Sequence, residues 1–301
     1  MTAPRTVPGR DCFAHFRPAA QEHDPVNAYL LSLVSAWLYP SIVTRCEGCG
    51  EKDVPRLLIA RLRHWGFGPE ARLISRSAFG RFDTQTAVAM DDRIVLVAFR
   101  GSENPELPSS RFVNALRDWL ITDADVAMES TNDLGAEVDV HRGFWRALMA
   151  VASDVEAAIA GPVDEGRRLW ITGHSMGGAL ATLAAPWLRH RGFPVGGVCT
   201  FGAPMVGGIR LANFFRRSPL NGFHRYVREG DPVPSLPPEP LNYQHAHPPY
   251  LINADGGVQR EDEAAASTDV LRHLPRGYCE ALHRALTDDQ RRTLPPPPPE
   301  N

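Results

Sequence analysis

Few cysteines, no long apolar run and little net charge set the first limits on what this sequence encodes. The five cysteines among 301 residues are too sparse for the disulfide framework of a small secreted domain. The apolar run at 28–38 has 11 residues, fewer than a bilayer-spanning helix needs, so no transmembrane segment is expected. Residues 1–24 contain no apolar signal sequence, which predicts a cytoplasmic location and leaves signal-free export as the alternative.

Nucleic-acid binding and metal chemistry find no support in the composition. A net charge of −3 gives no electrostatic reason to expect nucleic acid as a partner. Eleven histidines occur without an HExxH motif or a His/Cys cluster, so neither a metal nor an organic cofactor is predicted. Cys46 and Cys49 have the CxxC spacing of a zinc half-site or a redox pair. No second pair follows them, which favours two unpaired thiols in a loop.

The composition is that of a globular protein with an ample core, at 43% hydrophobic and 22% charged residues. We expect one domain over residues 25–288. Residues 1–24 are polar and contain proline, so we expect them to be disordered. Residues 289–301 include a polyproline run and are expected to form a disordered tail.

Apolar, strand-like runs alternate with helix-like segments between residues 86 and 230. The run at 94–99 is apolar throughout, as expected for a strand that is covered on both faces. This alternation predicts an α/β fold with a mostly parallel sheet, in which ligands bind at the carboxyl ends of the strands. Residues 234–249 contain six prolines and are expected to be irregular. The expected strands are 86–90, 94–99, 169–172, 195–201 and 223–228, and the expected helices are 25–38, 54–65, 141–160, 176–190, 208–217 and 276–286.

The most specific local signal is Gly173-His174-Ser175-Met176-Gly177, which lies between an apolar run and a helix-compatible stretch. A serine on a sharp strand-to-helix turn exposes its hydroxyl and places the next backbone N–H beside it. The flanking glycines leave room where the backbone and the helix pack tightly. Ser175 is therefore the predicted nucleophile, with the N–H of Met176 as an oxyanion donor. The alternative is an ordinary glycine-rich loop with a surface serine.

A serine nucleophile needs a base, and the base needs a group that orients it. The acid is predicted to be Asp231, which follows a strand and precedes a proline; the alternative is that it only shapes the turn. The base is predicted to be His273, in the loop before the last helix, a usual position for a catalytic imidazole. His245 and His247, in the proline-rich stretch, remain open as alternative bases.

These motifs, in their order along residues 25–286, make the chain similar to the class 3 lipases. The resemblance implies an α/β-hydrolase fold and maps the catalytic residues of that family onto Ser175, Asp231 and His273. It also implies that Ser102 supplies the second oxyanion donor, beside Met176. The stretches that carry the resemblance are Asn27–Leu31, Val97–Ser102, Val140–Phe144, the Ser175 motif, Phe201–Pro204, Gly230–Pro234 and His273-x-x-x-x-Tyr278.

The resemblance further places a lid at residues 103–117, where an apolar helical face could cover the site or pack permanently on the core. Asp118-Trp119 matches a pair that supports the oxyanion residue in the family, whereas Asp123 and Asp125 lie too late for that role. The apolar face comprises Phe112, Val113, Leu116, Trp119 and Leu120.

A serine ester hydrolase is the function that these features predict, most specifically a lipase acting on acylglycerols through an acyl-enzyme. Its partner would be an ester or lipid substrate, including one at a lipid–water interface. A phospholipase A1 and a short-chain or aryl carboxylesterase are the alternatives with the same chemistry. A non-catalytic binding module is disfavoured, because no member of the predicted triad is missing.

Overall fold

A computed structural model describes residues 9–78, 82–102, 127–238, 241–261 and 269–299. Its centre is an eight-stranded sheet in the order β1-β2-β3-β6-β7-β8-β9-β10. The pairings from β3 to β9 are parallel, and the outer pairings are antiparallel. The prediction of an α/β fold with a mostly parallel sheet is confirmed. The strands are β1 Arg72–Ala78, β2 Phe82–Met90, β3 Ile94–Phe99, β6 Arg168–His174, β7 Val195–Phe201, β8 Phe223–Arg228, β9 Pro249–Ile252 and β10 Val258–Arg260, with a separate hairpin of β4 Met128–Thr131 and β5 Val138–His141.

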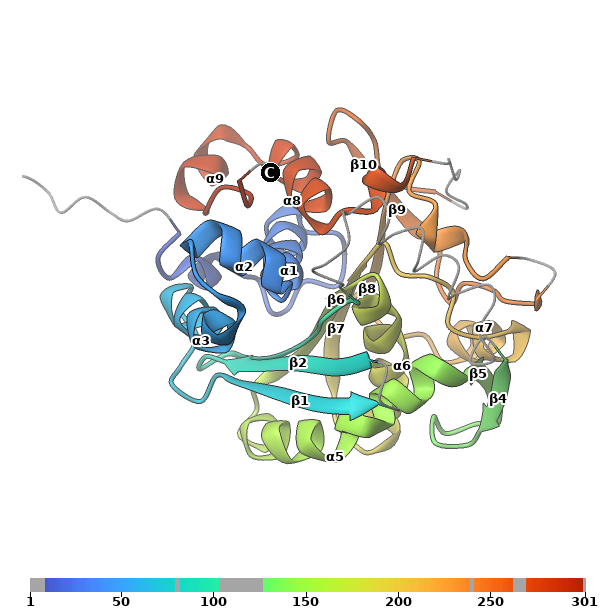
Figure 1. Cartoon of the computed structure of the whole chain (residues 1–301). Helices are drawn as coiled ribbons and strands as arrows, with labels where there is room; N and C mark the ends of the chain where they lie inside the picture. Colours follow the sequence, from blue (N-terminus) through green and yellow to red (C-terminus); the bar gives the residue numbers. More distant parts are fainter. Residues whose placement is uncertain (1–8, 79–81, 103–126, 239–240, 262–268, 300–301) are drawn as a thin grey trace, which may run out of the picture.

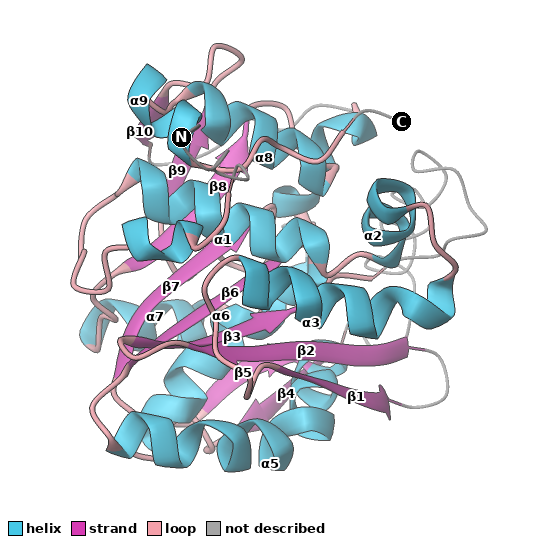
Figure 2. Cartoon of the chain, turned by 90° about the vertical axis from the view of Figure 1, so that its left-hand side faces the viewer, coloured by secondary structure: helices cyan, strands magenta, loops and turns pink. Residues whose placement is uncertain are grey.

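Helices cover both faces of the sheet (Figures 1 and 2). One face packs against α5, α6 and α7, and the other against α1, α3 and α8. Strand β3 shows why both layers form: Val95, Val97 and Phe99 face the first layer, while the alternate residues face the second. The helices are α1 Pro25–Trp37, α2 Pro40–Glu47, α3 Val54–His64, α5 Arg142–Asp164, α6 Met176–His190, α7 Ile209–Arg217, α8 Pro275–Arg284 and α9 Asp288–Thr293.

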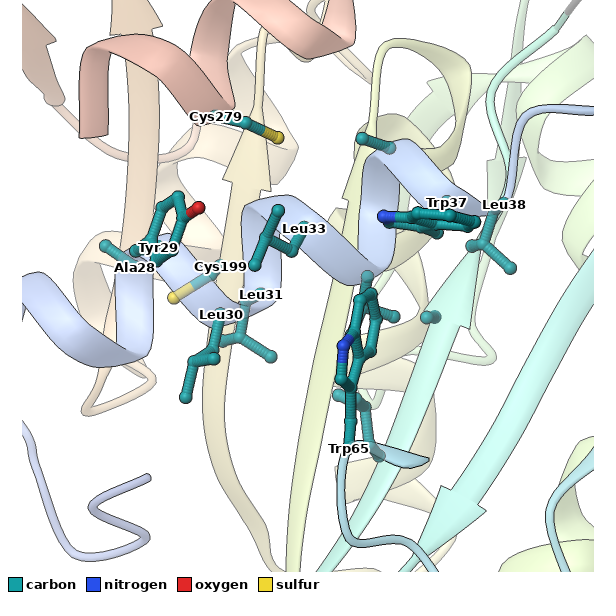
Figure 3. Packing of buried hydrophobic residues seen from close by; sticks show 14 of the residues in the cluster. Ala28, Tyr29, Leu30, Leu31, Leu33, Trp37, Leu38, Trp65, Cys199 and Cys279 are labelled. Atoms are coloured by element: carbon teal, nitrogen blue, oxygen red, sulfur yellow. The ribbon is translucent and has the colours of Figure 1, made fainter. Parts of the chain in front are cut away.

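Helix α1 lies in the interior of the second layer. Its start follows the sequence signals, because the Asp24 carboxylate accepts a 3.0 Å hydrogen bond from the N–H of Asn27 and Pro25 occupies the first turn. Every residue from Val26 to Trp37 is buried, so α1 is covered on all sides rather than on one face. Figure 3 shows its side chains packed against Trp65, Cys199 and Cys279.

The predicted disorder of residues 1–24 needs correction over residues 9–24, and that of residues 289–301 over residues 289–299. Cys12, Phe13 and Phe16 are buried in the layer around α1. At the other end, Leu294 is buried, and the carbonyl of Pro295 accepts a 2.6 Å hydrogen bond from the hydroxyl of Tyr29. Both segments are ordered because they carry a few apolar side chains that fill the second layer.

Within the described ranges, no single helix is long and apolar enough to cross a bilayer. Helices α1 and α2 meet that test only when they are taken together, and they are bent by 88° relative to each other.

Candidate active site

Ser175 stands at a strained turn between β6 and α6. Its backbone has φ 59° and ψ −128°, a conformation that a residue with a side chain rarely adopts. A Cβ on Gly173 would lie 2.3 Å from the backbone of Gly177, and one on Gly177 would lie 2.1 Å from the carbonyl oxygen of Phe99. Glycine at these two positions is what allows the helix to start directly above the strand, as the sequence predicts.

Asp231 and His273, which are 42 residues apart, meet beside this turn. His273 Nδ1 lies 2.9 Å from Asp231 Oδ2 and 3.1 Å from Oδ1, and both side chains are buried. The carboxylate also accepts hydrogen bonds from the backbone N–H of Val233 at 2.9 Å and from the Tyr278 hydroxyl at 2.6 Å. Asp231 is therefore held by three groups, and its orientation fixes a proton on Nδ1 of the imidazole.

The outward nitrogen of that imidazole is free to act as a base. Among the described residues, neither Ser175 Oγ nor His273 Nε2 has a hydrogen-bond partner, although both atoms are buried. Buried polar atoms without partners are costly and mark places where a ligand or a reaction uses them. Hydrogen bonds of this kind are often long in a free enzyme and tighten when the substrate binds.

Gly202, at the end of β7, makes room for this cluster. A Cβ there would lie 2.9 Å from Asp231 Oδ2, 2.9 Å from the Tyr278 hydroxyl and 3.1 Å from His273 Cε1. Its φ of 58° also disfavours any side chain. The Phe201–Pro204 stretch in the sequence therefore contains a backbone position close to Asp231, His273 and Tyr278.

The alternative bases lie elsewhere, in contact with other groups. His245 Nε2 is 2.6 Å from the carbonyl of Pro234, and His247 stacks on Phe223. Burial, and then the charge of Arg225, lower the pKa of His245 well below its usual value and that of His247 to about 4. The structure thus brings His273, and neither alternative, to Asp231.

His174, next to the nucleophile, connects the turn to the loop of His273. Its Nε2–H donates a 2.7 Å hydrogen bond to the His273 carbonyl, and the Tyr39 hydroxyl donates one of 2.7 Å to its Nδ1. Burial and the neighbouring His273 hold the pKa of His174 well below its usual value, so the ring is neutral at pH 7. These contacts tie the turn to the loop of His273, and nothing in the sequence pointed to Tyr39.

The two predicted oxyanion residues are in contact. Ser102, just after β3, is buried, and its hydroxyl donates a 3.1 Å hydrogen bond to the Met176 sulfur. Met176 is the first residue of α6, so its N–H has no carbonyl partner within the helix. Thioether sulfur is a weak acceptor, so the Ser102 hydroxyl is held without being strongly bound.

Several sequence predictions fall outside the described residues. These are the lid at residues 103–117 with its apolar face, the Asp118-Trp119 pair, and Asp123 and Asp125.

The described residues contain no group of three or more potential metal ligands. All five cysteines are free, and Cys46 and Cys49 are half-buried at the end of α2.

Tyr278→Phe tests the support of the acid. We expect kcat for ester hydrolysis to fall by about tenfold, because one of three hydrogen bonds to Asp231 is lost, at about 1.5–3 kcal/mol for a bond to a charged group. The phenylalanine ring keeps the packing, so KM should not change. Steady-state kinetics on a soluble ester, beside Tyr243→Phe as a control outside this cluster, measure the effect; equal kcat in wild type and Tyr278→Phe would contradict it.

The chain is similar to known proteins over part of its length. Residues 96–241 match the family described as Lipase (class 3). The chain is 35% identical over 187 residues to the secreted mono- and diacylglycerol lipase 1 of Fusarium solani, covering 62% of this chain and 51% of that protein. It is 32% identical over 177 residues to the secreted mono- and diacylglycerol lipase A of Penicillium cyclopium, covering 57% and 53%. The chain thus spans about half the length of these curated relatives.

Solved structures extend the likeness over most of the chain. The crystal structure of a mutant of MDLA from Penicillium cyclopium superposes with a TM-score of 0.58 at 25% identity, covering 82% of this chain and 92% of that one. The expected α/β-hydrolase architecture is therefore confirmed.

The predicted cytoplasmic location is wrong. Both relatives carry names that describe them as secreted, which points to an extracellular location. The matched segment, the relatives and the shared fold thus show that this chain is similar to the class 3 lipases, with the family match over residues 96–241.

Proposed function

We propose that the chain is a serine ester hydrolase that cleaves acylglycerols through a Ser175–His273–Asp231 triad. The observation that carries the proposal is the pairing of His273 with Asp231 beside a serine held at φ 59° on a strand-to-helix turn. A buried carboxylate, an oriented imidazole and a serine held on a tight turn are the parts that acyl transfer needs.

The reaction follows from the positions of these groups. His273 Nε2 takes the proton of Ser175 as Oγ attacks the ester carbonyl, and Asp231 stabilises the imidazolium. The backbone N–H groups of Met176 and Ser102 hold the oxyanion. The alcohol leaves with the proton from His273, and the imidazole then activates water, which releases the acid and restores Ser175.

The substrate class rests on the relatives. The two curated relatives above are named as mono- and diacylglycerol lipases, and one related structure is titled as a triacylglycerol lipase. We therefore propose partial or full acylglycerols as substrates, presented at a lipid–water interface.

The test uses the whole chain on several esters. We expect hydrolysis of p-nitrophenyl butyrate and of emulsified mono- and diacylglycerols, and a much lower rate on phosphatidylcholine vesicles. Faster release of fatty acid from the phospholipid would favour phospholipase A1. Activity confined to the soluble short-chain ester would favour a carboxylesterase, and no turnover of any ester would refute the proposal.

A further inference from the structure

A half-buried arginine outside the residues discussed above holds the loop that carries His273. Arg228 is the last residue of β8, and its guanidinium Nη1 donates a 2.9 Å hydrogen bond to the backbone carbonyl of Arg272. Arg272 directly precedes His273, so this bond fixes the peptide group next to the imidazole.

Arg228 also contacts the tyrosine that holds the acid. Its backbone N–H donates a 3.1 Å hydrogen bond to the Tyr278 hydroxyl, and its guanidinium carbon lies 6.0 Å from the centre of that ring. The Tyr278 hydroxyl in turn donates to Asp231. One residue at the end of β8 therefore contacts both the loop of the base and the support of the acid.

The absence of a side chain at Gly277 leaves room for this guanidinium. A Cβ at Gly277 would lie 2.0 Å from Arg228 Nη1 and 2.8 Å from Cζ. Gly277 is the third residue of α8, and glycine in a helix is destabilising relative to alanine. The space taken by the guanidinium gives a reason for a glycine at a position where helix propensity alone favours a side chain.

The guanidinium is held by a neutral backbone group rather than by an ion pair. In the part of the chain that the structure describes, no carboxylate lies within ion-pair distance of Arg228. Its charged or titratable neighbours are Tyr278, Arg272, Asp231 and Glu280. A planar fork of donors suits such a task better than an ammonium group, because less freedom is lost for each hydrogen bond.

We propose that Arg228 is a positioning residue for the reaction, because its hydrogen bond to the Arg272 carbonyl fixes the position of His273. Gly277 makes this possible by leaving room for the guanidinium. This inference rests on the proposed ester-hydrolase function. Misplacement of a reacting group by about 1 Å can lower a rate by about 100-fold. Replacing Arg228 should lower kcat and not raise KM, because Arg228 is not one of the groups proposed to bind the ester.

A double-mutant cycle tests the proposal. Arg228→Ala is expected to lower kcat on p-nitrophenyl butyrate by about 10- to 100-fold with KM unchanged. Gly277→Ala is expected to lower kcat in the same direction, because its methyl group displaces the guanidinium. The double variant should be no slower than Arg228→Ala alone, because the group that the methyl displaces is then absent. Arg228→Lys, which keeps a donor, should recover part of kcat.

Two variants serve as matched controls. Arg93→Ala removes another half-buried arginine that donates to backbone carbonyls, those of Phe13 and Phe16. Gly161→Ala adds a methyl group to a helical glycine with no atom within 4 Å of it. Both should leave kcat unchanged. Wild-type kcat in Arg228→Ala, or losses that multiply in the double variant, would overturn the proposal.

Hydrogen exchange of the amides in residues 270–278 gives a readout that needs no turnover. We expect faster exchange there in Arg228→Ala and in Gly277→Ala, and wild-type exchange in Arg93→Ala. If the wild-type chain cleaves no ester but exchange follows this pattern, the ester-hydrolase function is refuted, whereas the role of Arg228 in holding the loop of His273 is supported. Unchanged exchange in both variants would show that Arg228 does not hold this loop.

Discussion

Replacing Ser175 by alanine is expected to lower kcat for ester hydrolysis by about 10⁶-fold, as the loss of a triad serine does. The fold should survive, because alanine imposes no new steric demand at a backbone that already holds a side chain at φ 59°. Removing a buried hydroxyl without a partner should even raise the thermal midpoint slightly. Steady-state kinetics and thermal unfolding on the same preparations measure both effects.

Ser32→Ala is the matched control for this loss. It removes another buried hydroxyl, which donates to the Tyr29 carbonyl within α1 and lies outside the active site. We expect its kcat to equal that of the wild type. A Ser175→Ala protein with more than about 1% of wild-type kcat would place the nucleophile elsewhere, since the remaining groups alone give far less.

Asp231→Asn should lower kcat by about 10⁴-fold with little change in KM. The carboxylate accepts from the Val233 N–H, the Tyr278 hydroxyl and His273 Nδ1–H, whereas an amide has one acceptor oxygen. Its NH₂ group would face His273 Nδ1 and favour the tautomer with the proton on Nε2. That tautomer cannot take a proton from Ser175.

Glu229→Gln removes an exposed carboxylate two residues before Asp231 and should leave kcat unchanged. A pH–rate profile separates the tautomer effect from a loss of folding, because the small residual activity of Asp231→Asn should rise at high pH. Equal rates for the two variants at neutral pH would show that Asp231 only shapes the turn.

The nucleophile turn and the main strands could be predicted because their causes are local. Gly173, Ser175 and Gly177 carry the whole steric requirement within five residues, and strand β3 is apolar throughout. Asp231 could be singled out as the candidate acid because it directly follows a strand. The choice of His273 over His245 required the fold, since only the fold shows which imidazole reaches a carboxylate 42 residues earlier.

Other parts could not be predicted, because their causes are not local. Strands β9 and β10 have four and three residues, too few for a periodic pattern to appear. Residues 9–24 are ordered by the burial of a few scattered apolar side chains, which composition alone does not reveal. Arg228 gave no signal in the sequence, because its importance comes from a backbone carbonyl 44 residues later.

A cut in the chain beside the buried Leu294 is expected to weaken the support of Ser175. The Pro295 carbonyl receives the Tyr29 hydroxyl from α1, and Ser35 of the same helix lies 3.2 Å, Oγ to Oγ1, from Thr172 in the strand that leads to Ser175. Cleavage ahead of Leu294 would leave the buried Tyr29 hydroxyl without its hydrogen-bond acceptor, which would lower the free energy of unfolding by about 1–3 kcal/mol. A nick more than a hundred residues downstream would thus loosen the support of Ser175 while leaving the proposed triad in the chain.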